Sequence, residues 1–270
     1  MHHYFDKYYK PIIFSTISFL GLIYLEKLRF SNLNYFITAS VIYIVVLFLL
    51  LLLDQKNSSK NSIIPLLFDK YSFISNVSQH FILPIWLVIS IIFVMYVNID
   101  KNLVFIYTFL GNLCLLFCFV NIHSFYANNF LIERRTHLIY DFIKIFLFVI
   151  NSNILLHFYF SKNISEILLY LSFASLTFFL IFLICFRRLY EIKRASISIL
   201  LGTILMLLLM FWCISVLKLG FVYTNIFSII LFYIISAFIH HELDETLTVS
   251  VITEYLLWVL IMISILWGLN

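Results

Sequence analysis

VIYIVVLFLLLLL, residues Val41–Leu53, is the stretch that decides the fold of this chain. It is apolar on every face, so it lacks the alternation of apolar and polar residues that marks a strand of an outer-membrane barrel. With its flanking residues it is long enough to cross a hydrocarbon core about 30 Å thick. Inside lipid each backbone N–H and C=O must be paired within its own segment, so the run predicts a transmembrane helix.

Apolar runs of this kind recur along all 270 residues, of which 64% are hydrophobic and 11% are charged. A soluble domain carries about 25% charged residues, so the composition excludes a water-soluble fold. We therefore predict an all-α, polytopic transmembrane helical bundle of seven to nine helices, in a single integral membrane domain over 1–270. The first candidate span is short for a full crossing and the eighth is marginal. The nine candidate spans are Pro11–Leu25, Leu33–Leu53, Phe81–Asn98, Leu103–Asn121, Leu138–Phe160, Ile167–Phe186, Ser196–Leu217, Phe221–Phe238 and Val251–Trp267.

The distribution of basic residues predicts the topology. With nine spans, 12 of the 17 Lys and Arg residues fall on the side of the N-terminus and 5 on the other. Because basic residues accumulate in cytoplasmic loops, this bias places the N-terminus on the positive side and the C-terminus opposite. The five on the opposite side are Lys27, Arg29, Lys101, Lys162 and Lys218.

The connection Asp54–His80 is the longest between two spans. It begins with a polar run that ends at Lys60, and its later apolar residues are interrupted by Asp69, Lys70 and Gln79. Such mixed patterning predicts a segment that lies in the plane of the membrane interface.

The chain contains only five Ala and five Gly but 31 Phe and 17 Tyr. Small residues normally let transmembrane helices approach each other closely. We therefore expect the helices to be held together by Ser and Thr or by interdigitated aromatic rings, with support from partner subunits or lipid.

Ionisable residues within spans are costly, which makes them candidates for function. Asp141 and Lys144 lie three residues apart on one helix face, where they either begin a proton or ion pathway or pair with each other while Lys144 extends to the interface. Glu254 lies one turn into the last span, where it needs a partner from another helix or another subunit.

Resident cofactors are not indicated by the sequence. Cys114 and Cys118 share a helix face, but two thiols are more simply read as packing residues than as metal ligands. The eight histidines do not form facing pairs at one depth, as a transmembrane haem would need. Phosphate-binding loops, zinc-protease motifs and nucleophile elbows are absent. We expect no catalytic residue in the chain and no nucleic-acid partner.

A basic cluster follows the sixth span. It consists of Arg187, Arg188, Lys193 and Arg194. Such a cluster fixes topology and contacts anionic lipid headgroups.

Near the C-terminus, His240 and His241 precede the last span, Glu245 follows His241 by four residues, Trp258 follows by thirteen more, and the final segment is Ile263–Gly268. Over about 30 residues this arrangement resembles the C-terminal end of cytochrome c oxidase subunit III. The resemblance implies a subunit that carries no haem or copper, braces a catalytic subunit, binds phospholipid between its helices and supports proton uptake. The implied partners are the other membrane subunits of a respiratory complex, and the implied location is the mitochondrial inner membrane.

Other readings of the sequence remain open. A small-solute or ion transporter would place Asp141, Lys144 and Glu254 on its pathway, although transporters usually show internal repeats and broken helices. Another accessory subunit of a respiratory complex or an ATP synthase is a further alternative, as is a membrane-embedded enzyme. A bacterial inner membrane is the alternative location.

Overall fold

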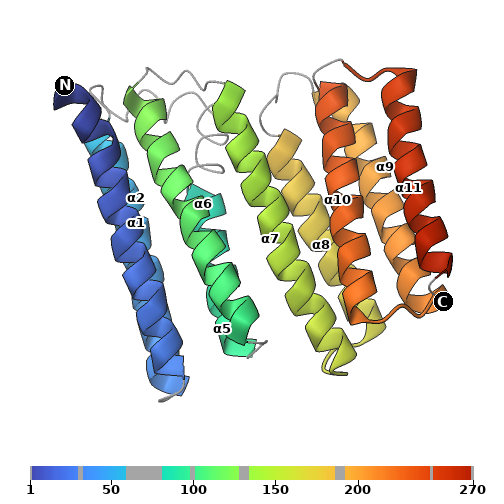
Figure 1. Ribbon diagram of the computed structural model, residues 1–270, viewed down its shortest axis with the longest axis horizontal. Helices are drawn as coiled ribbons and strands as arrows, with labels where there is room; N and C mark the ends of the chain where they lie inside the picture. Colours follow the sequence, from blue (N-terminus) through green and yellow to red (C-terminus); the bar gives the residue numbers. More distant parts are fainter. Residues whose placement is uncertain are drawn as a thin grey trace. The chain divides into compact units, whose positions relative to one another are not determined.

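The computed structural model describes residues 2–29, 33–58, 81–97, 101–127, 134–185, 192–243 and 246–268 (Figure 1). Within these ranges the chain forms nine α-helices and no strand, which confirms the all-α prediction. A π-helical turn, η3 (Trp212–Val216), continues the seventh helix. The α-helices are α1 (His2–Arg29), α2 (Leu33–Ser58), α5 (Leu83–Val97), α6 (Lys101–Ala127), α7 (Arg134–Phe160), α8 (Glu166–Cys185), α9 (Ile192–Phe211), α10 (Phe221–Leu243) and α11 (Val249–Gly268).

Each expected span corresponds to one helix, and the chain is an integral membrane protein. In the described part, six helices are long and apolar enough to cross a membrane, namely α1, α2, α6, α7, α8 and α10. The apolar segments of α5, of α9 with η3, and of α11 are shorter. Our expectation that the first and eighth spans are the short ones was wrong, because both gain helical turns from polar residues at their ends.

Several boundaries differ from the sequence-based expectation, among them those of α1 and α2. Helix α1 begins at His2 and continues through Pro11, whereas we expected the span to start at that proline. Helix α2 continues to Ser58, so Asp54–Ser58 belongs to a helix end and not to an interfacial segment. The rest of the expected interfacial segment, residues 59–80, lies outside the described residues.

The chain is arranged as two units, unit 1 (Met1–Leu147) and unit 2 (Phe148–Asn270). Unit 1 contains α1, α2, α5, α6 and the first part of α7, and unit 2 contains the rest of α7 and all later helices. The single membrane domain that the sequence suggests stays a prediction, and each unit is described by itself.

Unit 1 is a bundle in which α1, α2, α5 and α6 contact one another. Two of the five glycines lie where its helices cross, because a Cβ at Gly21 would overlap the Tyr43 ring and one at Gly111 would overlap Ile91. The Tyr43 hydroxyl lies 2.5 Å from Ser18 Oγ and donates to the Ser18 carbonyl oxygen at 3.0 Å, which ties α2 to α1.

Unit 2 is joined through large aromatic side chains. The rings of Phe148 on α7 and Phe232 on α10 stack with centroids 4.2 Å apart and an interplanar angle of 1°. Phe173 on α8 lies against Phe148 at 6.2 Å. Beside this aromatic group, Ser152 Oγ donates to the Asn225 side-chain oxygen at 2.9 Å. In lipid such contacts, not the hydrophobic effect, hold helices together.

Buried polar groups are mostly hydroxyls, and some of these bond to their own helix whereas others bond across helices. Of the thirteen buried polar or charged residues in the described part, eleven are Ser or Thr. Ser40 Oγ donates to the Phe36 carbonyl at 2.7 Å, and Thr108 Oγ1 donates to the Val104 carbonyl at 2.8 Å. The contacts between helices made by Ser18 and Ser152, together with the stacked rings of Phe148 and Phe232, agree with the expected packing through hydroxyl and aromatic side chains.

Candidate functional site

The ion pair predicted on α7 is present. Lys144 Nζ lies 2.9 Å from Asp141 Oδ1, and the two side chains are 2% and 15% exposed. The three-residue spacing puts both side chains on one helix face, where they form an ion pair with each other. The pairing expected from this spacing is confirmed, and the Lys144 side chain is buried. A place of the pair on a proton or ion pathway stays a hypothesis.

The residues that resemble the oxidase subunit lie around the connection between α10 and α11. His240 and His241 are in the last turn of α10, and Glu245 lies outside the described residues. His241 Nδ1 is 2.9 Å from Thr246 Oγ1, and the Thr246 N–H donates to the His241 carbonyl at 2.9 Å. The contacts of His241 with Thr246 stabilise the backbone at the end of α10, which is a structural role.

Beyond this connection, α11 begins at a hydroxyl cap. The Val251 N–H donates to Thr248 Oγ1 at 3.4 Å, which satisfies one of the N–H groups that a helix start leaves without a partner. Tyr255, one turn further on, brings its ring within 6.1 Å of the His241 ring. Glu254 and Trp258 are exposed, Trp258 to 53%.

The basic cluster is described only in part. Arg187 and Arg188 lie outside the described residues, and Lys193 and Arg194 are in the first turn of α9 with side chains that are not described. Their contact with lipid headgroups stays a prediction.

The thiols of Cys114 and Cys118 are free and buried in α6. Among the described residues, no group of three or more His, Cys, Asp and Glu side chains lies together in a way that could hold a metal ion. The packing role that the sequence favours for the two thiols agrees with their burial.

A polar cluster that sequence reasoning missed lies at the start of α8. Glu166 Oε1 accepts hydrogen bonds from the Tyr170 hydroxyl, at 2.8 Å, and from Ser215 Oγ. The Tyr170 hydroxyl and Ser215 Oγ are 2.9 Å apart, so each of the three side chains contacts the other two, and together they join α8 to η3. The four-residue spacing of Glu166 and Tyr170 was a readable signal, but Ser215 lies 49 residues from the carboxylate.

This cluster is built by local structure at both ends. Ser165 caps α8 by accepting from the Leu168 N–H at 3.3 Å, which sets Glu166 in the first turn, where a carboxylate is favoured. Ser215 belongs to η3, where the Leu217 N–H donates to the Trp212 carbonyl at 3.1 Å. The wider π turn alters the direction of the side chains that follow α9. The cluster therefore ties the start of α8 to η3.

Comparison of the chain with protein-family models, with curated proteins and with solved structures gives no match.

Proposed function

We propose that this chain is a non-catalytic subunit of a larger membrane complex, in which it braces a neighbouring subunit. The observation that carries the proposal is the exposed face of α11. None of the α11 side chains that the structure describes is buried, and the helix lies at the edge of unit 2, against α10 (Figure 1).

The chemistry of that face argues for a protein neighbour. Glu254 lies five residues into α11, about 8 Å along the helix axis, and Trp258 lies one turn further. A carboxylate facing lipid at that depth costs several kcal/mol, roughly 2.5 or more at the centre of a span. Indoles gather at the membrane interface, whereas Trp258 is nine residues from the helix start. A partner subunit that offers a hydrogen-bond donor to Glu254 and an acceptor to the Trp258 indole N–H would satisfy both side chains.

Helix α2 supplies an internal comparison. Its exposed side chains in the middle of the span include Val41, Ile42, Val45 and Phe48, with exposed fractions of 41% to 59%. That face carries no charge and suits lipid acyl chains without a protein partner. The difference between the two exposed faces supports assigning the α11 face to a partner subunit and the α2 face to lipid.

The resemblance at the C-terminal end gives this proposal its specific form, a divergent cytochrome c oxidase subunit III in the mitochondrial inner membrane, with bound phospholipid. What supports it is the spacing of His240, His241, Glu245 and Trp258. In that form the face with Glu254 and Trp258 would lie against another subunit of the oxidase.

A transporter is the second candidate, and the ion pair of Asp141 and Lys144 favours it. A buried charge pair within a span is a common element of ion and proton pathways. If the pair lies on a pathway, Asp141→Asn abolishes coupled uptake in proteoliposomes while the folded protein is retained. If the pair of Asp141 and Lys144 is only structural, the wild-type protein shows no coupled uptake in this assay.

The test of the proposal is purification of the chain in mild detergent from its own membrane, followed by quantitative mass spectrometry. We expect other membrane subunits in stoichiometric amount, and oxidase subunits if the specific form is right. Glu254→Gln should reduce the recovery of these subunits. The control Glu26→Gln makes the same charge change at a half-buried side chain of α1 and should not reduce it. Recovery of the wild-type chain alone contradicts the proposal.

A further inference from the structure

Two lysines adopt the left-handed backbone conformation, and they are the non-glycine residues with positive φ in the described part of the chain. Lys162 has φ 59° and Lys218 has φ 50°. A residue with a Cβ is disfavoured in this conformation, where Gly or Asn is usual. A long cationic side chain at both positions runs against the local backbone preference, and such backbone outliers are often found at functional sites.

Both lysines lie in short, ordered connections of unit 2. Lys162 is the second residue after α7. Its N–H donates to the Tyr159 carbonyl at 2.9 Å, and the Asn163 N–H donates to the Phe158 carbonyl at 2.9 Å. Lys218 follows the π turn η3 and precedes α10. Since hydrogen-bonded turns fix the backbone on both sides, the two Cα–Cβ directions are set by the fold.

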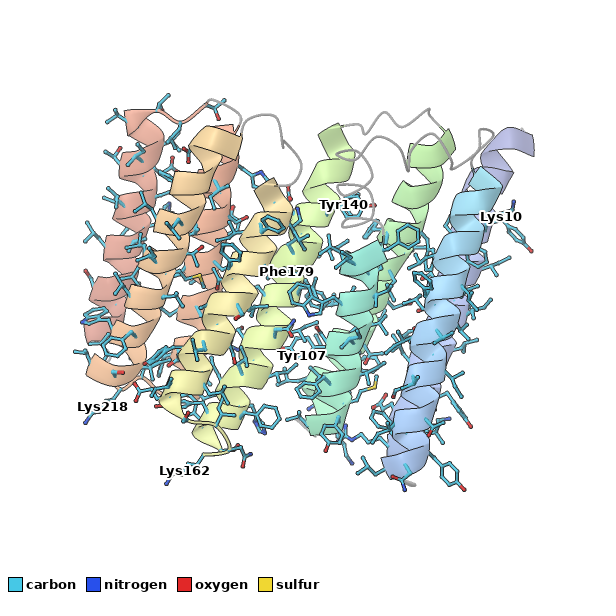
Figure 2. All side chains as sticks on the ribbon, turned by 180° about the vertical axis from the view of Figure 1, so that it is seen from behind. Lys10, Tyr107, Tyr140, Lys162, Phe179 and Lys218 are labelled. Carbon is cyan, nitrogen blue, oxygen red and sulfur yellow. The ribbon has the colours of Figure 1, made fainter. Side chains whose placement is uncertain are left out.

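The two connections lie side by side. Phe160 at the end of α7 meets Phe221 at the start of α10, with ring centroids 5.9 Å apart at 85°. On the other side, the contact of Tyr170 with Ser215 joins the start of α8 to η3. These two contacts bracket both connections, and both lysine side chains are exposed at the same end of the unit (Figure 2).

This end of unit 2 has the features of a membrane–water boundary. Four apolar segments end or begin here, because the spans stop at Phe160 and Val216 and start again at Glu166 and Phe221. Aromatic residues that favour the headgroup region lie beside these ends. They are Tyr159, Trp212 and Tyr223. The lysines thus stand at the level of the lipid headgroups, with the aromatic residues at the border of the acyl chains.

We propose that connections 161–165 and 217–220 bind the phosphate of an anionic phospholipid between the ammonium groups of Lys162 and Lys218. Glu166, the acidic residue nearest in sequence to Lys162, is engaged through Oε1 by Tyr170 and Ser215. The proposal concerns the end of the chain opposite the basic cluster of residues 187–194 in the predicted topology, and it is independent of the proposed function.

The test uses Trp212, which lies in η3 close to both connections. The protein is reconstituted in phosphatidylcholine vesicles that contain increasing amounts of phosphatidylglycerol with brominated acyl chains, and quenching of Trp212 fluorescence is recorded. The Trp212 signal is the difference between the protein and its Trp212→Phe variant. Each lysine near an anionic surface contributes roughly a fivefold preference, so we expect about 30-fold preference for phosphatidylglycerol.

Two double variants separate the charge from the backbone. Lys162→Asn with Lys218→Asn removes both charges and keeps residues that tolerate the left-handed conformation, so the preference should fall close to one while quenching by brominated phosphatidylcholine stays unchanged. Lys162→Arg with Lys218→Arg keeps both charges and should keep the preference. Equal quenching by the two lipids in the wild type, or an undiminished preference in the Asn variant, overturns the proposal.

Discussion

Replacement of Gly21 by alanine probes the close approach of α1 and α2. An alanine Cβ would lie 2.5 Å from Tyr43 Cε2 and 2.8 Å from Cδ2, whereas ordinary contact needs about 3.4 Å or more. The ring would have to move by roughly 1 Å, and two hydrogen bonds to Ser18 hold it in place.

The expected magnitude follows from three contributions. Overpacking costs about 1–3 kcal/mol, and weakening the contacts to Ser18 costs about 0.6 kcal/mol for each bond in a membrane. The higher helix propensity of alanine returns up to about 1 kcal/mol. We therefore expect Gly21→Ala to lower the free energy of unfolding by about 1–3 kcal/mol, seen as a lower denaturant midpoint for unfolding in detergent micelles.

The same experiment has an internal control and a rescue. A Cβ at Gly220 meets no atom within 4 Å, so Gly220→Ala should leave the midpoint unchanged or raise it. In a Tyr43→Ala background the ring is gone, and Gly21→Ala should become neutral or stabilising. A Gly21→Ala protein as stable as the Gly220→Ala protein would refute the close approach of the two helices.

Two further predictions concern the interior contacts. The stacked rings of Phe148 and Phe232 should couple by about 0.5–1.5 kcal/mol in a double-mutant cycle to leucine, measured by unfolding in detergent; additive effects contradict the stacking. Lys144→Met should destabilise the fold by about 3–5 kcal/mol, because it leaves the Asp141 carboxylate without its cation, and adding Asp141→Asn should restore most of that loss. If the double variant is as unstable as Lys144→Met alone, the unpaired Asp141 carboxylate is not the cause of the lost stability.

For the part of the chain that the structure describes, the sequence was sufficient to locate the nine α-helices but not to place their ends. Apolar runs report the part of a helix that lies in hydrocarbon, whereas the backbone hydrogen bonds continue through polar residues at the interface. Helix α1 therefore begins at His2, nine residues before the apolar run, and α2 extends past Leu53 to Ser58. The preference of Pro11 for a helix start was overridden by the continuing helix.

Pairings between distant residues were the least predictable part of the candidate sites. Asp141 and Lys144 could be paired from sequence because a helix fixes where residues three apart lie. No such local rule joins Ser215 to Glu166 or Phe148 to Phe232, since these contacts depend on which helices are neighbours and on their rotation. The π turn that carries Ser215 has no sequence signature of its own in an apolar run.

The measurement that tests the central claim most directly is photo-crosslinking in the native membrane. A photoreactive residue is placed at Leu257 on α11, which is 58% exposed, and in a second protein at Ile42 on α2, which is 59% exposed. The account predicts a discrete adduct with another protein from position 257 and lipid adducts from position 42. Lipid adducts alone from both positions would contradict the assignment of the α11 face to a partner subunit.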